Sequence, residues 1–157
     1  MKKLITALAC TLLCLIGSSA YAQTATPTEP EGQIAVADTL FKGTFHNAET
    51  GLTIVLDLPD EKLTVPNMSF LGPVGGYMTG KIYGVWMLIS WKVNGEEATL
   101  RFTNDIGADS QTILLTHKGN GRFAYRTLEG NAIRRVEGRK LVKIIDKMEM
   151  IKKPQSR

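Results

Sequence analysis

Side chains that commonly carry out catalysis or bind metal ions are scarce in this sequence. The 157 residues include two histidines, His46 and His117, and two cysteines, Cys10 and Cys14, which both lie in the first apolar run. A zinc site needs three or four ligands, and nothing in the spacing of the two histidines points to one. The chain also lacks a G-x-S-x-G turn, a P-loop and an H-E-x-x-H helix. We therefore expect a protein without enzymatic activity, bound metal or cofactor.

Oxygen-bearing side chains cluster in residues 104–110, NDIGADS. Such oxygens are the ligands that Ca²⁺ prefers, but their spacing here is not that of an EF-hand. Polar residues around a glycine, between two apolar runs, are also typical of an ordinary turn. We interpret this segment as a polar turn, with a calcium loop as the alternative.

Both tryptophans lie in residues 83–102, YGVWMLISWKVNGEEATLRF, which have the pattern of a β-hairpin. A two-residue type I′ turn needs φ > 0 at both positions, and the pair Asn94-Gly95 suits it. That turn pairs Trp91 with Ala98. It predicts a buried apolar face made of Met87, Ile89, Trp91, Ala98, Leu100 and Phe102. Because side chains alternate along a strand, Trp86 is predicted on the opposite, polar face.

A second hairpin is predicted in residues 111–128, with Gly119-Asn120-Gly121 as a three-residue loop. Its predicted shared face holds Ile113, Leu115, His117, Phe123, Tyr125 and Thr127. If these faces line a hollow barrel, the side chains best suited to touch a ligand are Met87, Trp91, Phe102, His117 and Tyr125.

Further strand-length runs of apolar and β-branched residues, separated by glycine and proline turns, indicate an all-β antiparallel meander. The predicted strands are 39–46, 52–58, 77–83, 85–93, 96–103, 111–118, 122–128 and 132–136. In residues 139–153, RKLVKIIDKMEMIKK, the alternation favours closing strands, and a short amphipathic helix is the alternative. Consecutive short hairpins favour closure into a small up-and-down β-barrel, with a two-sheet β-sandwich as the alternative.

Residues 1–22 have the pattern of a Sec-type secretory signal peptide. Two lysines precede the apolar run LITALACTLLCLIG, and Ala20-Tyr21-Ala22 predicts cleavage before Gln23. The mature chain would then hold no cysteine and no transmembrane segment, and it would be periplasmic or secreted. Export makes nucleic acid an unexpected partner. Residues 23–36 read as a Thr/Pro/Glu linker, 37–153 as a single β domain and 154–157 as a disordered tail.

The charge of the chain is unevenly distributed. Residues 23–132 hold 8 basic and 12 acidic side chains, whereas residues 133–157 hold 9 basic and 3 acidic ones. A basic segment on a mildly acidic body is either a solvated face or a surface that attracts an anionic ligand, partner or lipid headgroup. The candidates for surface contact are Trp86, Arg134, Arg135, Arg139 and Lys140.

Several short motifs are similar to those of calycin-type barrels, the group that includes lipocalins and avidins. FKGTFHN, residues 41–47, resembles the G-x-W first strand of those families, with Phe45 in place of the tryptophan. TGKIY (79–83), SWK (90–92) and LLT (114–116) follow in an avidin-like order. The resemblance implies a small secreted barrel. It does not imply biotin binding, because Ile113 stands where the pattern WLLT would place tryptophan.

These observations predict an exported, non-enzymatic binding protein that holds a small apolar or amphipathic ligand, with an anionic group as an option, in a β-barrel. The alternative is a periplasmic protein-interaction or inhibitor-like module that acts on another envelope protein through its surface. The sequence alone does not indicate an oligomeric state.

Overall fold

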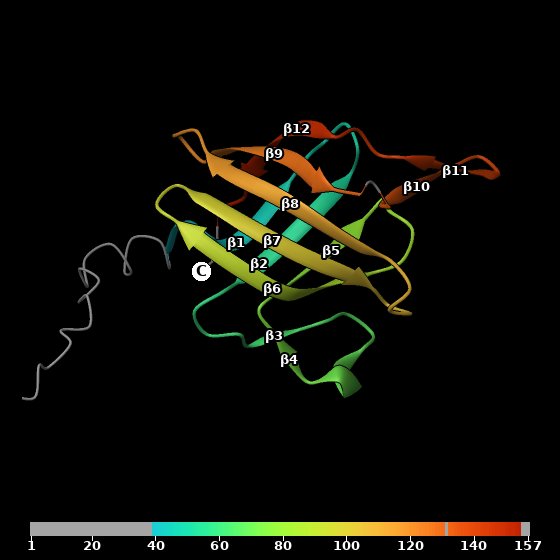
Figure 1. Ribbon diagram of the computed structural model, residues 1–157, viewed down its shortest axis with the longest axis horizontal. Helices are drawn as coiled ribbons and strands as arrows, with labels where there is room; N and C mark the ends of the chain where they lie inside the picture. The colour runs from blue at the N-terminus through green and yellow to red at the C-terminus, as the bar shows by residue number, and fades with distance from the viewer. Residues whose placement is uncertain (1–38, 131, 155–157) are drawn as a thin grey trace, which may run out of the picture.

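The computed structural model describes residues 39–130 and 132–154, which form twelve strands and a 3-10 helix, η1 (Ser69–Leu71) (Figure 1). The strands are β1 (Lys42–His46), β2 (Leu52–Asp57), β3 (Leu63–Thr64), β4 (Pro73–Val74), β5 (Gly76–Gly80), β6 (Trp86–Asn94), β7 (Glu97–Asn104), β8 (Ser110–His117), β9 (Arg122–Glu129), β10 (Arg134–Glu137), β11 (Lys140–Lys143) and β12 (Lys147–Lys152). The predicted signal peptide, the linker and the tail beyond Pro154 lie outside the described residues.

Eight of these strands close into an antiparallel barrel in the order β1-β12-β9-β8-β7-β6-β5-β2. Strands that follow one another in the chain are neighbours in the barrel, apart from two inserted hairpins. The hairpin β3–β4 interrupts the path from β2 to β5, and β10–β11 interrupts the path from β9 to β12. The prediction of an up-and-down barrel is confirmed over the two-sheet sandwich. Residues 139–153 contribute the strands β11 and β12, as their alternation favoured.

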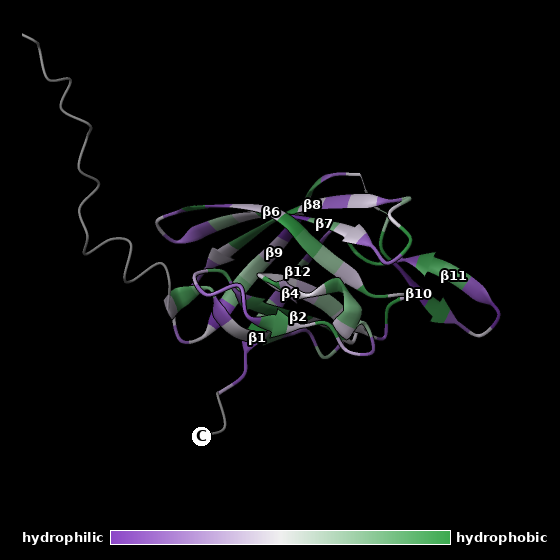
Figure 2. Ribbon diagram, turned by 90° about the horizontal axis from the view of Figure 1, so that it is seen from below, coloured by the Kyte–Doolittle hydropathy of each residue, from purple (hydrophilic) through white to green (hydrophobic). Residues whose placement is uncertain are grey.

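The alternating strand directions give the barrel two distinct ends. The connections 47–51, 81–85, 105–109 and 130–146 lie at one end, and the segments 39–41, 58–75, 95–96 and 118–121 lie at the other. We call the first the arm end, because the hairpin of residues 134–143, the arm, projects there from the barrel body (Figure 2). We call the second the terminal end, because the described chain begins and stops there.

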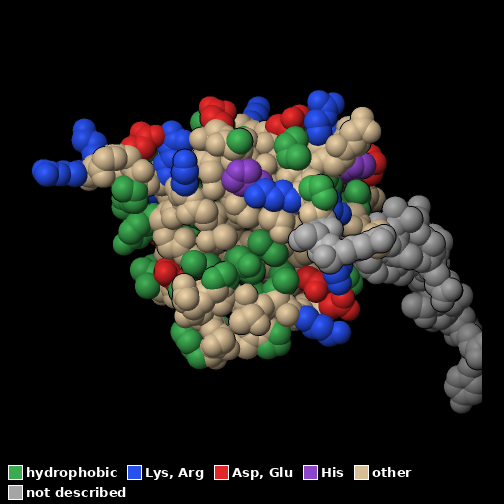
Figure 3. All heavy atoms as spheres, turned by 180° about the vertical axis from the view of Figure 1, so that it is seen from behind, with side chains coloured by type: hydrophobic (Ala, Val, Ile, Leu, Met, Phe, Trp, Pro, Cys, Tyr) green, Lys and Arg blue, Asp and Glu red, His purple; other side chains and the backbone are tan. Residues whose placement is uncertain are grey.

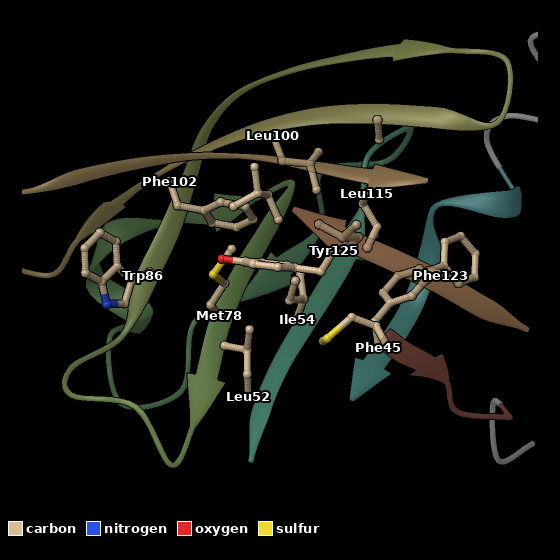
Figure 4. Packing of buried hydrophobic residues seen from close by; sticks show 14 of the residues in the cluster. Phe45, Leu52, Ile54, Met78, Trp86, Leu100, Phe102, Leu115, Phe123 and Tyr125 are labelled. Atoms are coloured by element: carbon tan, nitrogen blue, oxygen red, sulfur yellow. The ribbon is translucent and has the colours of Figure 1, made fainter. Parts of the chain in front are cut away.

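Side chains fill the interior of the barrel (Figure 4). Phe45 and Phe123 meet edge to face with their ring centroids 4.8 Å apart, and both are fully buried. Tyr125 and Phe102 lie further toward the arm end and are 2% and 0% exposed. An eight-stranded barrel is just wide enough to be filled in this way. The two inward-facing aromatics that were predicted as ligand contacts, Phe102 and Tyr125, are thus part of the packed core.

The predicted register of the β6–β7 hairpin is wrong. Trp91 pairs with Leu100 rather than with Ala98, and Asn94 pairs with Glu97, so that the turn residues are Gly95 and Glu96. Among these residues Gly95 has a positive φ, 57°, which matches a type II′ turn with glycine first. A bulge between Leu88 and Ser90 then shifts the pairing once more. The bulge places an extra residue in β6, so its side chains stop alternating regularly.

The predicted burial of the two tryptophans is reversed, for two different reasons. Trp86 pairs with Asn104 on the inner face and is 3% exposed, so its assignment to an exposed polar face is wrong. Trp91 shares a face with Leu100 but is 41% exposed, because β5 pairs with β6 only through Met87 and Trp86 and does not reach Trp91. Met87 and Ile89 also leave the core; Met87 is half-buried and Ile89 is exposed.

The predicted geometry of the β8–β9 hairpin is confirmed. His117 pairs with Phe123, Leu115 with Tyr125 and Ile113 with Thr127. The loop holds three consecutive residues at positive φ, Gly119, Asn120 and Gly121, and the Lys118 amide donates to the Arg122 carbonyl at 2.8 Å. Glycine and asparagine tolerate the left-handed region, which is why this loop could be located from the sequence.

Candidate functional site

A hollow of about 500 Å³ opens at the arm end of the barrel. Its lining comes from four separate stretches of chain: residues 83–86 at the start of β6, 104–109 at the β7–β8 turn, 132–134 at the start of the arm, and Leu141 of β11. The lining residues are Tyr83, Gly84, Trp86, Asn104, Asp105, Ile106, Asp109, Ala132, Arg134 and Leu141. A cavity of this size matches the usual volume of small-molecule sites.

Trp86 gives the hollow an aromatic wall that is held rigidly. Its indole Nε1 donates to the Tyr83 carbonyl at 3.3 Å. The Tyr83 amide in turn donates to the Arg134 carbonyl at 2.7 Å, which ties the loop before β6 to the base of the arm. Figure 4 shows the Trp86 ring at the arm end of the core, beyond Phe102. A tryptophan in this position offers an apolar surface that needs no rearrangement to accept a ligand.

The polar side of the hollow is the turn of residues 105–109. The Asn104 side chain donates from Nδ2 to Asp109 Oδ2 and accepts from the Asp109 amide at Oδ1, both at 3.2 Å. Asp105 lies opposite Gly84, where a Cβ would come within 3.3 Å of its Oδ1. The interpretation of this segment as a polar turn agrees with these bonds, which use the Asn104 oxygen within the turn itself.

Gln111 holds the connection that leads to the arm, and no motif in the sequence pointed to it. Its side chain is 1% exposed. It donates to the Glu129 carbonyl at 2.7 Å and accepts from the Ala132 amide at 2.9 Å. A buried amide that uses both its donor and its acceptor on backbone groups fixes that backbone firmly. Gln111 therefore positions Ala132 and Arg134 at the rim of the hollow.

The hollow brings together two residues that the sequence had placed on the surface and none of the five predicted ligand contacts. Trp86 and Arg134 line it. Met87 lies outside the core, Phe102 and Tyr125 lie within the core, and Trp91 and His117 lie toward the terminal end. Arg135 pairs with Glu137, and Arg139 and Lys140 extend along the arm away from the hollow.

His117 has partners that account for its position. Its Nδ1 lies 3.1 Å from Glu96 Oε1, and its ring packs 5.0 Å from that of Phe123. Trp91 likewise donates from Nε1 to Glu61 Oε1 at 3.2 Å, which links β6 to the 58–75 segment. Within residues 39–130 and 132–154, no three His, Cys, Asp or Glu side chains are placed to hold a metal ion.

The Tyr125 hydroxyl is a titratable group whose pKa is shifted by burial in the barrel core. It is buried and has no partner in hydrogen-bonding geometry. Burial raises the pKa of this hydroxyl to about 12 because it disfavours the phenolate; nearby Asp146 adds to the rise, and Thr127 offsets part of it. Its position inside the packed core gives it no access to a ligand in the hollow.

The fold and the hollow together define a closed, antiparallel, eight-stranded barrel with a ligand-sized opening at one end. This architecture is consistent with a calycin-like barrel. No family model, curated protein or solved structure matches the chain. Among the described residues, none forms a helix with the length and apolarity needed to span a membrane.

Proposed function

We propose that this chain is an exported binding protein, of calycin-like type, that holds a small amphipathic molecule in the hollow at the arm end. The observation that carries the proposal is a ligand-sized hollow with the rigid, buried indole of Trp86 as one wall. Such a combination of apolar wall and few convergent polar groups is the usual composition of small-molecule sites.

The lining favours a ligand with an apolar body and a polar end. Trp86, Ile106 and Leu141 supply apolar surface. Arg134 is the cation of the lining and would attract an anionic group, while Asp105 and Asp109 face a donor from the other side. The mixed charge of the rim favours a molecule with both donors and acceptors over a plain hydrocarbon.

The proposal can be tested with anilinonaphthalene sulfonate, an anionic aromatic dye, as the probe. In a Trp91→Phe background Trp86 is the one remaining tryptophan of the chain, so dye bound in the hollow should quench its fluorescence. Ile106→Glu, at a residue 79% exposed on the rim, should weaken dye binding about tenfold or more without affecting the core. Ile89→Glu is the matched control, because Ile89 is 54% exposed on β6 and does not line the hollow.

Equal dye affinity for the two variants would contradict the proposal. The natural ligand can then be sought by native mass spectrometry of protein purified from the periplasm of its own host. A small molecule should accompany the parent chain and be depleted from Ile106→Glu.

The open edge of β6 favours a second candidate function, the contact with another envelope protein. Residues 90–94 pair with β7 on one side, but β5 pairs with β6 only as far as Met87. An exposed strand edge that carries Ile89 and Trp91 can accept an added strand from a partner. Ile89→Glu should reduce such binding and leave dye binding intact, which is the reverse of the effect expected for Ile106→Glu.

A further inference from the structure

Exposed apolar side chains gather at the arm end. Of the twelve large hydrophobic residues that are exposed in the described chain, six lie on the arm or on the loops beside it. They are Tyr83, Ile106, Val136, Leu141, Val142 and Ile145. Single exposed hydrophobics are ordinary, but a group at one end of a molecule marks a surface that meets an apolar phase or a partner.

The arm is a two-stranded sheet that stands apart from the barrel. Its register pairs Arg134 with Lys143 and Val136 with Leu141, so one face carries cations at its base and an aliphatic pair nearer its tip. Val136 is 59% and Leu141 46% exposed. A lone two-stranded hairpin gains little stability in water. The projection of the arm into solvent (Figure 2) therefore suggests that the arm contacts something other than the barrel.

Four of the five cations of the arm differ from Lys42 at the terminal end in having no acidic partner among the described residues. Arg134, Arg139, Lys140 and Lys143 form no ion pair with any other described residue, whereas Arg135 pairs with Glu137. At the terminal end Lys42 binds Asp57 and Asp60, and Lys152 donates to two backbone carbonyls. Figure 3 shows basic side chains at the tip of the projecting arm. The arm therefore presents free positive charge beside exposed aliphatic groups.

We propose that the arm end docks on the surface of an anionic lipid membrane. Cations that reach the headgroups attract anionic lipid, while aliphatic side chains beside them enter the interface. A membrane fits better than an acidic protein because the exposed apolar surface extends beyond the hollow: Tyr83, Ile106 and Leu141 line it, but Val136, Val142 and Ile145 lie outside it. The hollow would then open toward the bilayer, but the docking surface does not depend on ligand binding there.

The experiment is co-sedimentation with phosphatidylcholine vesicles with and without phosphatidylglycerol. The protein is prepared without residues 1–22, whose apolar run would itself partition into lipid. The buried core of the described chain lies between residues 41 and 150, so this preparation keeps every strand of the barrel. We expect binding to the anionic vesicles alone, and we expect it to weaken as salt is added. Equal binding to both kinds of vesicle would overturn the proposal.

Matched charge variants separate the arm from general basicity. Arg139→Ser combined with Lys140→Ser should weaken vesicle binding by about fivefold for each cation removed. Lys92→Ser combined with Lys118→Ser removes two exposed cations, one from the β6 strand and one from the terminal end, and should leave binding unchanged. Equal losses in the two variants would refute a specific role for the arm.

A spectroscopic variant tests contact with the lipid directly. Leu141→Trp should show a blue-shifted tryptophan emission on addition of anionic vesicles, whereas Ile89→Trp on the barrel wall should not shift. Membrane docking would be overturned if the emission of Leu141→Trp did not shift. It would also be overturned if the protein did not bind vesicles and bound an acidic polypeptide instead. Loss of dye binding in the hollow with vesicle binding intact would contradict only the proposed ligand site.

Discussion

At the scale of single residues, Tyr125 combines burial with a hydroxyl that has no hydrogen-bonding partner. Its pKa is raised to about 12, above the value of about 10 for an exposed tyrosine. The folded chain therefore retains this proton at a pH where the unfolded chain has lost it. The free energy of unfolding should fall between about pH 10 and about pH 12, by at most about 3 kcal/mol in all.

Tyr125→Phe should remove this alkaline loss. At neutral pH the variant should be as stable as the parent or up to about 1 kcal/mol more stable, because a buried hydroxyl without a partner costs desolvation energy. Urea unfolding near neutral pH and near pH 11 measures both effects. Tyr83→Phe is the control, since Tyr83 is 64% exposed. A clear loss of stability at neutral pH would show that the hydroxyl is satisfied in solution.

Residue types alone predicted much of the core but misassigned the tryptophans. The buried sides of β7, β8 and β9 were predictable because their alternation is unbroken; Leu100, Phe102 and Tyr125 are all buried as expected. In β6 the pair Asn94-Gly95 fits a type I′ turn, yet Gly95 opens a type II′ turn, so Trp91 pairs two residues further along β7 than predicted and keeps its face. The bulge at Ile89 adds one residue to β6, and a one-residue shift exchanges the faces of a strand, so Trp86 turns inward.

At the scale of elements, one close backbone approach marks where β2 and β5 meet at the arm end. Gly80 has a φ of 110°, and a Cβ there would come 2.1 Å from the Gly51 carbonyl oxygen. Gly80→Ala should therefore cost more than about 3 kcal/mol, since it adds a backbone clash to an unfavourable φ. Gly95→Ala is the comparison, because Gly95 also has a positive φ, 57°, but nothing lies within 4 Å of its Cβ position.

The comparison variant should lose only about 1 kcal/mol, the cost of placing alanine in the left-handed region. Chemical unfolding of both proteins gives the two values. Similar losses for Gly80→Ala and Gly95→Ala would mean that β2 and β5 separate easily at Gly51, and that the barrel seam there is loose.

The hollow could not have been predicted from the sequence, because its walls lie far apart in the chain. Trp86, Asp105 and Arg134 become neighbours only when β6, β7 and the arm are arranged by barrel closure. The sequence did single out Trp86 and Arg134, through the predicted exposed position of Trp86 and the basic C-terminal segment. The prediction that a ligand would lie on the barrel axis was wrong, because the side chains of Phe45, Phe102 and Tyr125 fill that space.

At the scale of the whole molecule, the ion pairing of basic side chains differs between a cluster at the terminal end and the arm. At the terminal end Lys42 hydrogen bonds lower the pKa of Asp60, and the same contacts with Asp60 and Asp57 raise the pKa of Lys42. The favourable contribution of Asp60 is therefore present at neutral pH and is lost as the pH falls through its lowered pKa. The pairing is exposed to solvent, so its effect on stability is small. In the arm, by contrast with this cluster, four of the five cations form no ion pair with a described residue.

The contacts at the base of the arm predict that the arm can be removed without unfolding the barrel. Ile133 and Ile144 are buried, and the Ile144 amide donates to the Ile133 carbonyl at 3.2 Å, so a short Gly-Ser loop in place of residues 134–143 can close the hairpin base. The main loss is the bond from the Tyr83 amide to the Arg134 carbonyl. The free energy of unfolding should fall by only about 1 kcal/mol, while binding to anionic vesicles should disappear.

Ile144→Ala should give the reverse result, because it keeps the arm and removes buried core volume. It should cost about 2–4 kcal/mol in the free energy of unfolding and leave vesicle binding unchanged under conditions where the barrel stays folded. Urea unfolding and co-sedimentation of the two variants therefore separate the stability of the barrel from the activity of its arm end. If loss of the arm unfolded the barrel, the arm would be needed for the stability of the fold. The exposure of its cations and aliphatic residues would then no longer indicate a docking surface.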